Sequence, residues 1–279
     1  MRRAALAALA IAAALHGAAA ADPADSPNGA DNFRAELGAF FADFTKIYGT
    51  WFGETGRFWL LDSTGQRGTS GYVDIVDLHW QPDSRALGAS KLHSTYTMGR
   101  LMHSWVPHFY TMSTLGATAF TAVFPRALVE TEGNWIVPQV RGLVFTFGAG
   151  DRYYPTVNRP YLVLGGSYAL PKMSVSYRYW YGAGLTGLNT QTHLITFAYG
   201  ARLDVWFRFE LLWGDESFAT GVQYDTNLVS RGASFTLEKW VTPHAGFLVN
   251  PEFTEISIAS DENVVLHRIQ ILARGFYTF

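Results

Sequence analysis

Hydrophobic and polar residues alternate along several stretches of this chain. In the segment 203–213 every odd position is apolar, whereas the even positions from 204 to 210 carry Asp204, Trp206, Arg208 and Glu210. Side chains of a β-strand alternate between its two faces, so this period predicts a strand with one apolar face and one mostly polar face. The segments 33–41, 173–181 and 233–238 follow the same rule.

Turn-like clusters rich in glycine, proline and small polar residues separate these stretches. They lie at 62–65, 81–84, 148–151, 182–190 and 260–263. The pattern predicts candidate strands at 33–45, 49–61, 70–80, 92–104, 108–121, 128–136, 138–148, 159–169, 172–182, 192–201, 203–213, 231–241, 244–256 and 264–279. The alternation is weakest between 92 and 136.

The composition is less charged than that of a typical soluble domain. Hydrophobic residues make up 48% and charged residues 16%, against about 25% charged residues in soluble domains. Beyond residue 21 no uninterrupted apolar run approaches the roughly 18 residues of a spanning helix, which leaves the closed β-barrel among membrane folds. The soluble alternative is an all-β sandwich or a lipocalin-like barrel, whose apolar faces would point into a core.

The expected fold class is therefore all-β, a transmembrane antiparallel up-and-down β-barrel. Residues 31–279 number 249, and about 20 residues for each strand with its loop favour 12 strands. Barrels of 10 or 14 strands are the alternatives, because single-chain bacterial barrels use even numbers. The chain has no cysteine, so disulfides and thiolate sites are excluded, and its net charge of −2 does not indicate nucleic-acid binding. No cofactor is expected.

The N-terminal residues indicate export. Residues 1–21 combine a basic start, an apolar run and a small-residue cleavage site, which are the three parts of a secretory signal peptide. Residues 22–30 are expected to form a flexible mature N-terminus, and 31–279 to form the barrel.

The last predicted strand alternates up to Tyr277 and Phe279. It resembles the last strand of bacterial outer-membrane barrels, whose terminal aromatic belongs to the signal read by the barrel-assembly machinery. Arg274 stands where that signal usually carries glycine. The resemblance implies a location in the cell outer membrane with both termini periplasmic. Periplasmic chaperones, outer-membrane lipid and lipopolysaccharide would then be partners, and the oligomeric state stays open.

Four stretches resemble YaiO-type outer-membrane barrels. The segment 36–44 is similar to their first strand, 124–132 to the entry of their middle strands, and 147–155 to a strand with a tyrosine turn. The segments 164–171 and 174–179 are similar to their paired hairpin. Some relatives lie near cell-envelope polysaccharide systems, so the resemblance implies glycan handling. It supplies no catalytic residues.

Charged residues occupy the inward parity of the predicted strands. The lumen-lining candidates are Arg178, Asp204, Arg208, Glu210, Glu238, Arg268 and Arg274. They would set the field of a pore, or they would form a salt-bridge network that plugs a narrow barrel. The hypothesis is a narrow pore for small polar or saccharide solutes, or a barrel associated with envelope polysaccharide. A structural or surface-binding barrel that acts through its loops is an alternative.

Tryptophans are frequent along the predicted strands. Trp51, Trp59, Trp80, Trp105 and Trp135 are expected in interface belts or in the barrel wall. A path of aromatic rings for sugars along the lumen is the more specific hypothesis.

Three histidines raise the alternative of a lipid-modifying outer-membrane enzyme. His93, His103 and His108 lie within sixteen residues, and Ser94 and Ser104 follow the first two. Adjacent residues of a strand face opposite ways, so neither His-Ser pair forms a catalytic dyad by itself, and no catalytic residue is predicted. The three histidines with a carboxylate would suit Zn²⁺ or Ni²⁺, but their spacing does not require it, and no metal is predicted.

Overall fold

The computed structural model describes residues 33–44, 49–60, 68–82, 92–118, 125–153, 158–183, 189–200, 205–215, 228–258 and 261–279. The predicted signal peptide 1–21 and N-terminal segment 22–30 lie outside these residues. In the described part of the chain, no helix is long and apolar enough to cross a membrane.

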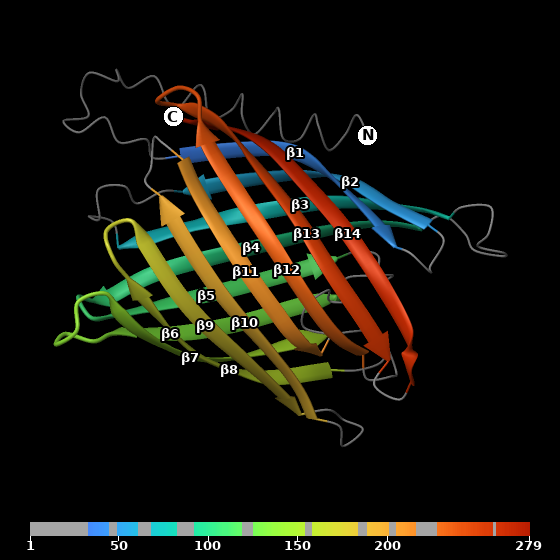
Figure 1. The fold of residues 1–279 in the computed structure, drawn as a ribbon. Coiled ribbons are helices and arrows are strands. Elements are labelled where there is room, and N and C mark those ends of the chain that lie inside the picture. The colour runs from blue at the N-terminus through green and yellow to red at the C-terminus, as the bar shows by residue number, and fades with distance from the viewer. Residues whose placement is uncertain are drawn as a thin grey trace.

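The elements are strands that pair antiparallel with their neighbours along the chain (Figure 1). They are β1 (Phe33–Phe44), β2 (Gly49–Leu60), β3 (Thr69–Pro82), β4 (Leu92–Val106), β5 (Phe109–Thr118), β6 (Ala127–Ile136), β7 (Leu143–Tyr153), β8 (Asn158–Ala169), β9 (Met173–Ala183), β10 (Asn189–Gly200), β11 (Val205–Asp215), β12 (Leu228–Trp240), β13 (Ala245–Ile258) and β14 (Asp261–Thr278). The β1 strand also pairs with β14, which closes the sheet into a barrel.

The expectation of 12 strands is wrong, because the barrel has 14. The estimate assumed loops that are too long. Only residues 107–108 separate β4 from β5, and only residues 241–244 separate β12 from β13. The region 92–136, where the alternation is weakest, contributes three paired strands, β4, β5 and β6.

The seventh strand begins five residues later than predicted. Residues 137–142 form a turn in which the Val137 N–H donates to the Leu143 carbonyl at 3.0 Å, and Gly142 takes a φ of 87°. The cluster 148–151, predicted as a turn, lies inside β7. Gly148 and Gly150 face the interior there, and a Cβ at either position would crowd Glu132 or Tyr161 on the adjacent strand.

The barrel is apolar outside and polar inside. Large hydrophobic side chains that project outward include Leu37, Phe41, Leu101, Leu115, Phe147, Leu162, Ile269 and Ile271, each about half exposed. The largest fully buried side chains include Glu132, Thr192, Thr254 and Thr278. A soluble sandwich or lipocalin-like barrel would show the reverse arrangement, so the structure excludes that alternative.

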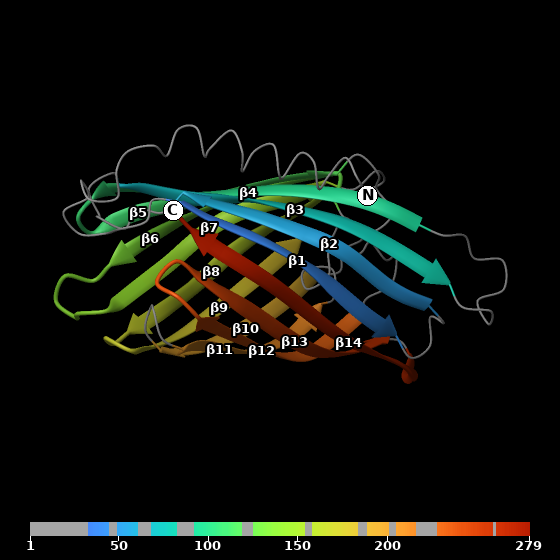
Figure 2. The same cartoon turned by 90° about the horizontal axis from the view of Figure 1, so that it is seen from above.

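The two described ends of the barrel sheet meet at one rim, which we call the terminal end; the opposite rim is the far end. The N–H of Phe33 donates to the carbonyl of Phe279 at 2.9 Å, and the N–H of Phe279 donates back at 3.0 Å. The rings of Phe33, Phe58 and Phe279 pack together beside this junction. Figure 2 shows β1 lying between β2 and β14 at this closure.

Candidate functional site

The inner wall near the closure carries a chain of ion pairs, which we call the seam network. Arg34 on β1 reaches across β14 and β13 to Glu238 on β12, donating at 3.0 and 2.8 Å to its two oxygens. The Arg34 Nε also lies 2.9 Å from Glu36 Oε1. Its guanidinium sits 3.8 Å above the Phe276 ring, and Trp240 donates to Glu238 at 2.9 Å. Contacts with Phe276 and Trp240 therefore fix the positions of both Arg34 and Glu238.

Arg274 continues the seam network on β14. Its guanidinium lies 3.2 Å from Glu36 Oε2 and 3.2 Å from Asp74 Oδ1, so it joins β1 to β3 across the interior. Arg57 of β2 pairs with the other oxygen of Asp74. Gly38, opposite Arg274 in the register, leaves room for this side chain, since a Cβ there would lie 2.7 Å from the Arg274 Cγ. Arg274 thus pairs with two carboxylates, and both lie on the β1 side of β14.

A second group of ion pairs, the β4–β9 network, lines the wall away from the closure. Arg178 on β9 donates to Glu132 on β6 at 2.9 Å, and the Glu132 side chain has no exposed surface. The pair spans the two strands between them. Gly148 on β7 and Gly165 on β8 lie beneath the two side chains, which would otherwise be blocked.

The other pairs of the β4–β9 network lie on the same wall. Arg100 Nη2 lies 3.6 Å from Glu130 Oε1, and its Nε donates to Thr114 at 2.9 Å. The hydroxyl of Tyr161 donates to the other Glu130 oxygen at 2.8 Å. Each carboxylate of this wall thereby contacts at least one group from a different strand.

The carboxylates of two further pairs retain more contact with solvent. Arg208 Nε lies 3.5 Å from Glu210 Oε1, and their side chains are 40% and 22% exposed. Arg268 donates to Glu252 at 2.5 Å, and the Glu252 side chain is 25% exposed. The side chains of both pairs point into the barrel, from strands β11, β13 and β14.

The structure places most of the predicted lumen residues within these groups. Arg178, Arg208, Glu210, Glu238, Arg268 and Arg274 all face inward and each contacts an oppositely charged side chain. Asp204 lies outside the described residues. Their roles in selectivity remain predictions, as does the role of Tyr277 and Phe279 in assembly.

Several inward charges were not predicted as site residues. They are Arg34, Glu36, Arg57, Asp74, Arg100, Glu130, Glu132 and Glu252. The alternation of faces in β1, β2, β3 and β6 is a signal that could have identified them. The partners could not be identified in this way, because the pairs join strands far apart in the chain.

The tryptophans divide between the two faces. Trp51 stacks on Trp80 at 5.9 Å between ring centroids, and both lie on the inner face of their strands, with the buried residues. Trp59, on the same face of β2, donates to Glu36 at 2.7 Å. Trp105 and Trp135 instead project outward near the terminal end and are largely exposed, as interface belts require.

The three histidines considered for catalysis do not meet. His93 lies near the start of β4 and His103 ten residues along it, about 33 Å away at 3.3 Å per residue. His103 pairs with Thr69 at 2.8 Å between side-chain atoms, and His108 belongs to the turn after β4. Ser94 faces inward and is buried. The possible metal set of these three histidines is therefore not formed.

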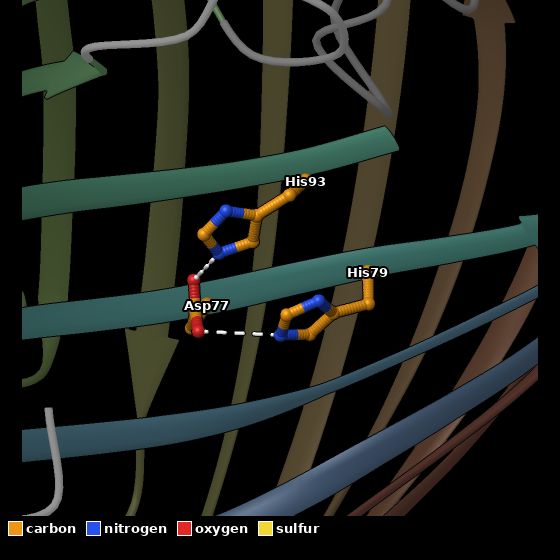
Figure 3. Close-up of side chains that lie close together, drawn as sticks. All are labelled: Asp77, His79 and His93. Carbon is orange, nitrogen blue, oxygen red and sulfur yellow. Dashed lines mark hydrogen bonds and ion pairs between the residues drawn. The ribbon is translucent and has the colours of Figure 1, made fainter. Parts of the chain in front are cut away.

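His93 instead joins Asp77 and His79 on the outer wall (Figure 3). Its Nε2 lies 2.6 Å from Asp77 Oδ1, and His79 Nε2 lies 3.3 Å from Asp77 Oδ2. The three ligand atoms lie within 4.8 Å of one another. We call these three residues the outer-wall triplet.

Comparison with known proteins adds the fold and little else. No protein-family model matches the chain, and no curated protein matches it. The TodX monoaromatic hydrocarbon channel has a TM-score of 0.53 at 7% identity, over 89% of this chain and 90% of that one. OpdQ from Pseudomonas aeruginosa has a TM-score of 0.48 at 8% identity, over 90% and 99%. The anion-selective porin from Comamonas acidovorans has 0.47 at 7%, also over 90% and 99%.

The chain is thus a closed 14-stranded antiparallel barrel of the porin-like, outer-membrane type. The fold and the apolar exterior point to the outer membrane. The TodX channel has a similar fold, and the 7% identity between the two chains supports no similarity beyond the fold. The resemblance to YaiO-type barrels stays a prediction.

Proposed function

We propose that this protein is a narrow outer-membrane pore for small polar solutes, with saccharides as the favoured class. The observation that carries the proposal is an inner wall of paired charges that still contact solvent, of which the 40% exposed Arg208 is the clearest case. Barrels of about 8 strands are filled by side chains, whereas those of 16–18 strands leave an aqueous channel. A barrel of 14 strands lies nearer the second group.

The pairing of the inward carboxylates favours neutral polar solutes over cations. In the described residues, each inward carboxylate lies within 3.6 Å of an arginine; these carboxylates are Glu36, Asp74, Glu130, Glu132, Glu210, Glu238 and Glu252. Pairing weakens the net field that a permeating ion meets. It leaves charged donors and acceptors at the more exposed pairs, and these form strong hydrogen bonds with hydroxyl groups.

Inward aromatic rings supply the second element of sugar recognition. Trp51 and Trp80 stack on the inner wall toward the far end, and Trp180 packs beside Tyr161 and Val163. A sugar ring presents C–H groups on its faces and hydroxyls at its edge. Flat apolar rings and paired charges on the same inner wall match both surfaces.

Single-channel recording of the refolded protein in planar bilayers tests the proposal. Heat-dependent migration on a gel is the control that the barrel has folded. We expect discrete openings with weak ion selectivity, and interruption of the current by maltose and longer malto-oligosaccharides. A folded barrel that never conducts would overturn the pore.

A matched pair of variants tests the saccharide class separately. Trp51→Ala and Trp80→Ala remove inward rings, whereas Trp105→Ala removes a ring from the outer surface. The two inward variants should weaken block by malto-oligosaccharides and the outer variant should not. A conducting barrel that sugars never block would overturn the saccharide assignment while leaving the pore intact.

A further inference from the structure

The outer-wall triplet lies on the lipid-facing side of the barrel. Asp77 and His79 share the parity of Val73 and Ile75, which are outward and exposed on β3. His93 lies on the same face of β4 as Leu101, whose side chain points outward and is exposed. The triplet is therefore separate from the paired charges of the inner wall.

Its place along the strands is the far-end interface. His93 is the second residue of β4, and Asp77 lies within the last six residues of β3. Charged side chains on the lipid face are costly at the bilayer midplane and nearly free of cost near the interface. Glu54 on β2, opposite Asp77 in the register and exposed, adds a further outward polar group to this region. The triplet can thus meet water and ions.

Both imidazoles direct the same nitrogen at one carboxylate. His93 Nε2 lies 2.6 Å from Oδ1 of Asp77, and His79 Nε2 lies 3.3 Å from Oδ2. In a tetrahedral Zn²⁺ site with bonds of 2.0–2.1 Å, ligand atoms lie about 3.3–3.4 Å apart. The 3.3 Å separation of His79 from Asp77 already has this value, whereas the 2.6 Å contact of His93 with Asp77 lengthens by about 0.7–0.8 Å when the metal binds. The third is bounded by the 4.8 Å that contains all three atoms.

Neighbouring residues hold these side chains in place. The rings of His79 and His93 stack at 4.6 Å with an angle of 14°, and Phe52 stacks on His79 at 5.4 Å. Thr95 donates to Asp77 Oδ1 at 2.8 Å, which fixes the carboxylate. Outer contacts that orient ligands in this way strengthen metal binding.

From this geometry we propose that Asp77, His79 and His93 form a Zn²⁺ site on the outer wall of the barrel. Two imidazole nitrogens and one carboxylate suit Zn²⁺, whereas Ca²⁺ and Mg²⁺ require six or more oxygen ligands. The His93 side chain is 50% exposed, so the fourth position faces the surroundings and takes water. The metal joins strands β3 and β4, which pair antiparallel.

Zinc titration of the refolded, tag-free protein in detergent micelles tests the site. Isothermal calorimetry should show one Zn²⁺ per chain, and Co²⁺ should give the strong visible absorption of a tetrahedral site. Replacing a ligand in His79→Gln or His93→Gln should weaken binding by at least about tenfold, since loss of an orienting contact alone costs 10–100-fold. Heat-dependent migration confirms that each variant is folded.

His103→Gln is the matched control, because His103 is also outward on β4 but lies ten residues from His93. It should bind Zn²⁺ as the parent protein does. The proposal is overturned if the His79→Gln/His93→Gln double variant binds Zn²⁺ as well as the parent. It is equally overturned if His103→Gln loses as much affinity as His93→Gln.

Discussion

Arg178 on β9 and Glu132 on β6 form an ion pair of 2.9 Å across two intervening strands. The two residues are not exposed equally, because the Arg178 side chain is 25% exposed and that of Glu132 is fully buried. The pair reaches across β7 and β8 only because Gly148 and Gly165 lie beneath it. The ion pair between Arg178 and Glu132 therefore depends on glycine at positions 148 and 165.

Removing Arg178 should destabilise the barrel more than removing Glu132. Arg178→Met leaves a buried carboxylate without its guanidinium, which costs about 3–5 kcal/mol. Glu132→Met leaves an arginine that can turn toward solvent, so the loss should be smaller. Urea unfolding in lipid vesicles, followed by tryptophan fluorescence, measures both. The double variant should lose less than the sum of the two, and simple additivity would contradict the coupling.

Gly148→Ala should also destabilise the barrel. A Cβ at this position would lie 2.5 Å from the Thr131 carbonyl oxygen and 3.1 Å from the Glu132 Cγ. We expect a loss of about 1–3 kcal/mol from this overpacking. Gly275→Ala is the control, because nothing lies within 4 Å of its Cβ, and it should change stability by less than about 0.5 kcal/mol. Equal effects in the same unfolding assay would refute the steric account.

The sequence predicts which face of a strand a residue occupies better than it predicts the residue's partner. Alternation with a period of two is a local property, so the inward parity of Arg208 and Glu210 follows from β11 alone. The partner of Arg34 lies 204 residues away, and it depends on the register of every strand between β12 and β1. Local patterns contain no information on that cumulative register.

Glycine and histidine show the same limit. Gly148 and Gly150 look like turn residues, but their role is to make space for Glu132 and Tyr161. These two side chains belong to neighbouring strands, so the sequence of β7 alone does not reveal this role. Asp77 and His79 share a face by their spacing. That His93 lies opposite His79 depends on how β3 and β4 pair, whereas proximity along the chain groups His93 with His103 and His108.

Charge substitutions at the exposed inward pair should change ion selectivity in opposite directions. Arg208→Glu adds negative charge to the inner wall and should favour cations, whereas Glu210→Arg should favour anions. We expect permeability ratios to shift by about twofold or more, because charges within roughly 8 Å are only partly screened at physiological salt. Reversal potentials in a salt gradient measure this shift. The swapped double variant keeps the net charge and should return close to the parent value; unchanged potentials in conducting single variants would exclude the pair from the ion path.

The seam network should contribute more to stability than the pair at the other end of the same strand. Arg274 and Arg268 both face inward on β14, so they form a matched comparison. Arg274→Met removes one of the two arginine partners of each of two carboxylates, Glu36 and Asp74, whose side chains are 2% and 8% exposed. Arg34 and Arg57 remain as their other partners. Arg268→Met releases Glu252, which is a quarter exposed and can be hydrated.

We therefore expect Arg274→Met to cost about 1.5–3 kcal/mol, since each buried carboxylate loses one charged partner and keeps another, and Arg268→Met to cost about 1 kcal/mol or less. Adding Glu36→Gln and Asp74→Asn to Arg274→Met should restore part of the loss, since a neutral amide costs less to bury than a carboxylate that has lost one of its arginine partners. The midpoint of urea unfolding and the temperature at which the folded gel band disappears report the order. If Arg268→Met is as destabilising as Arg274→Met, burial of the carboxylates does not decide the strength of these pairs.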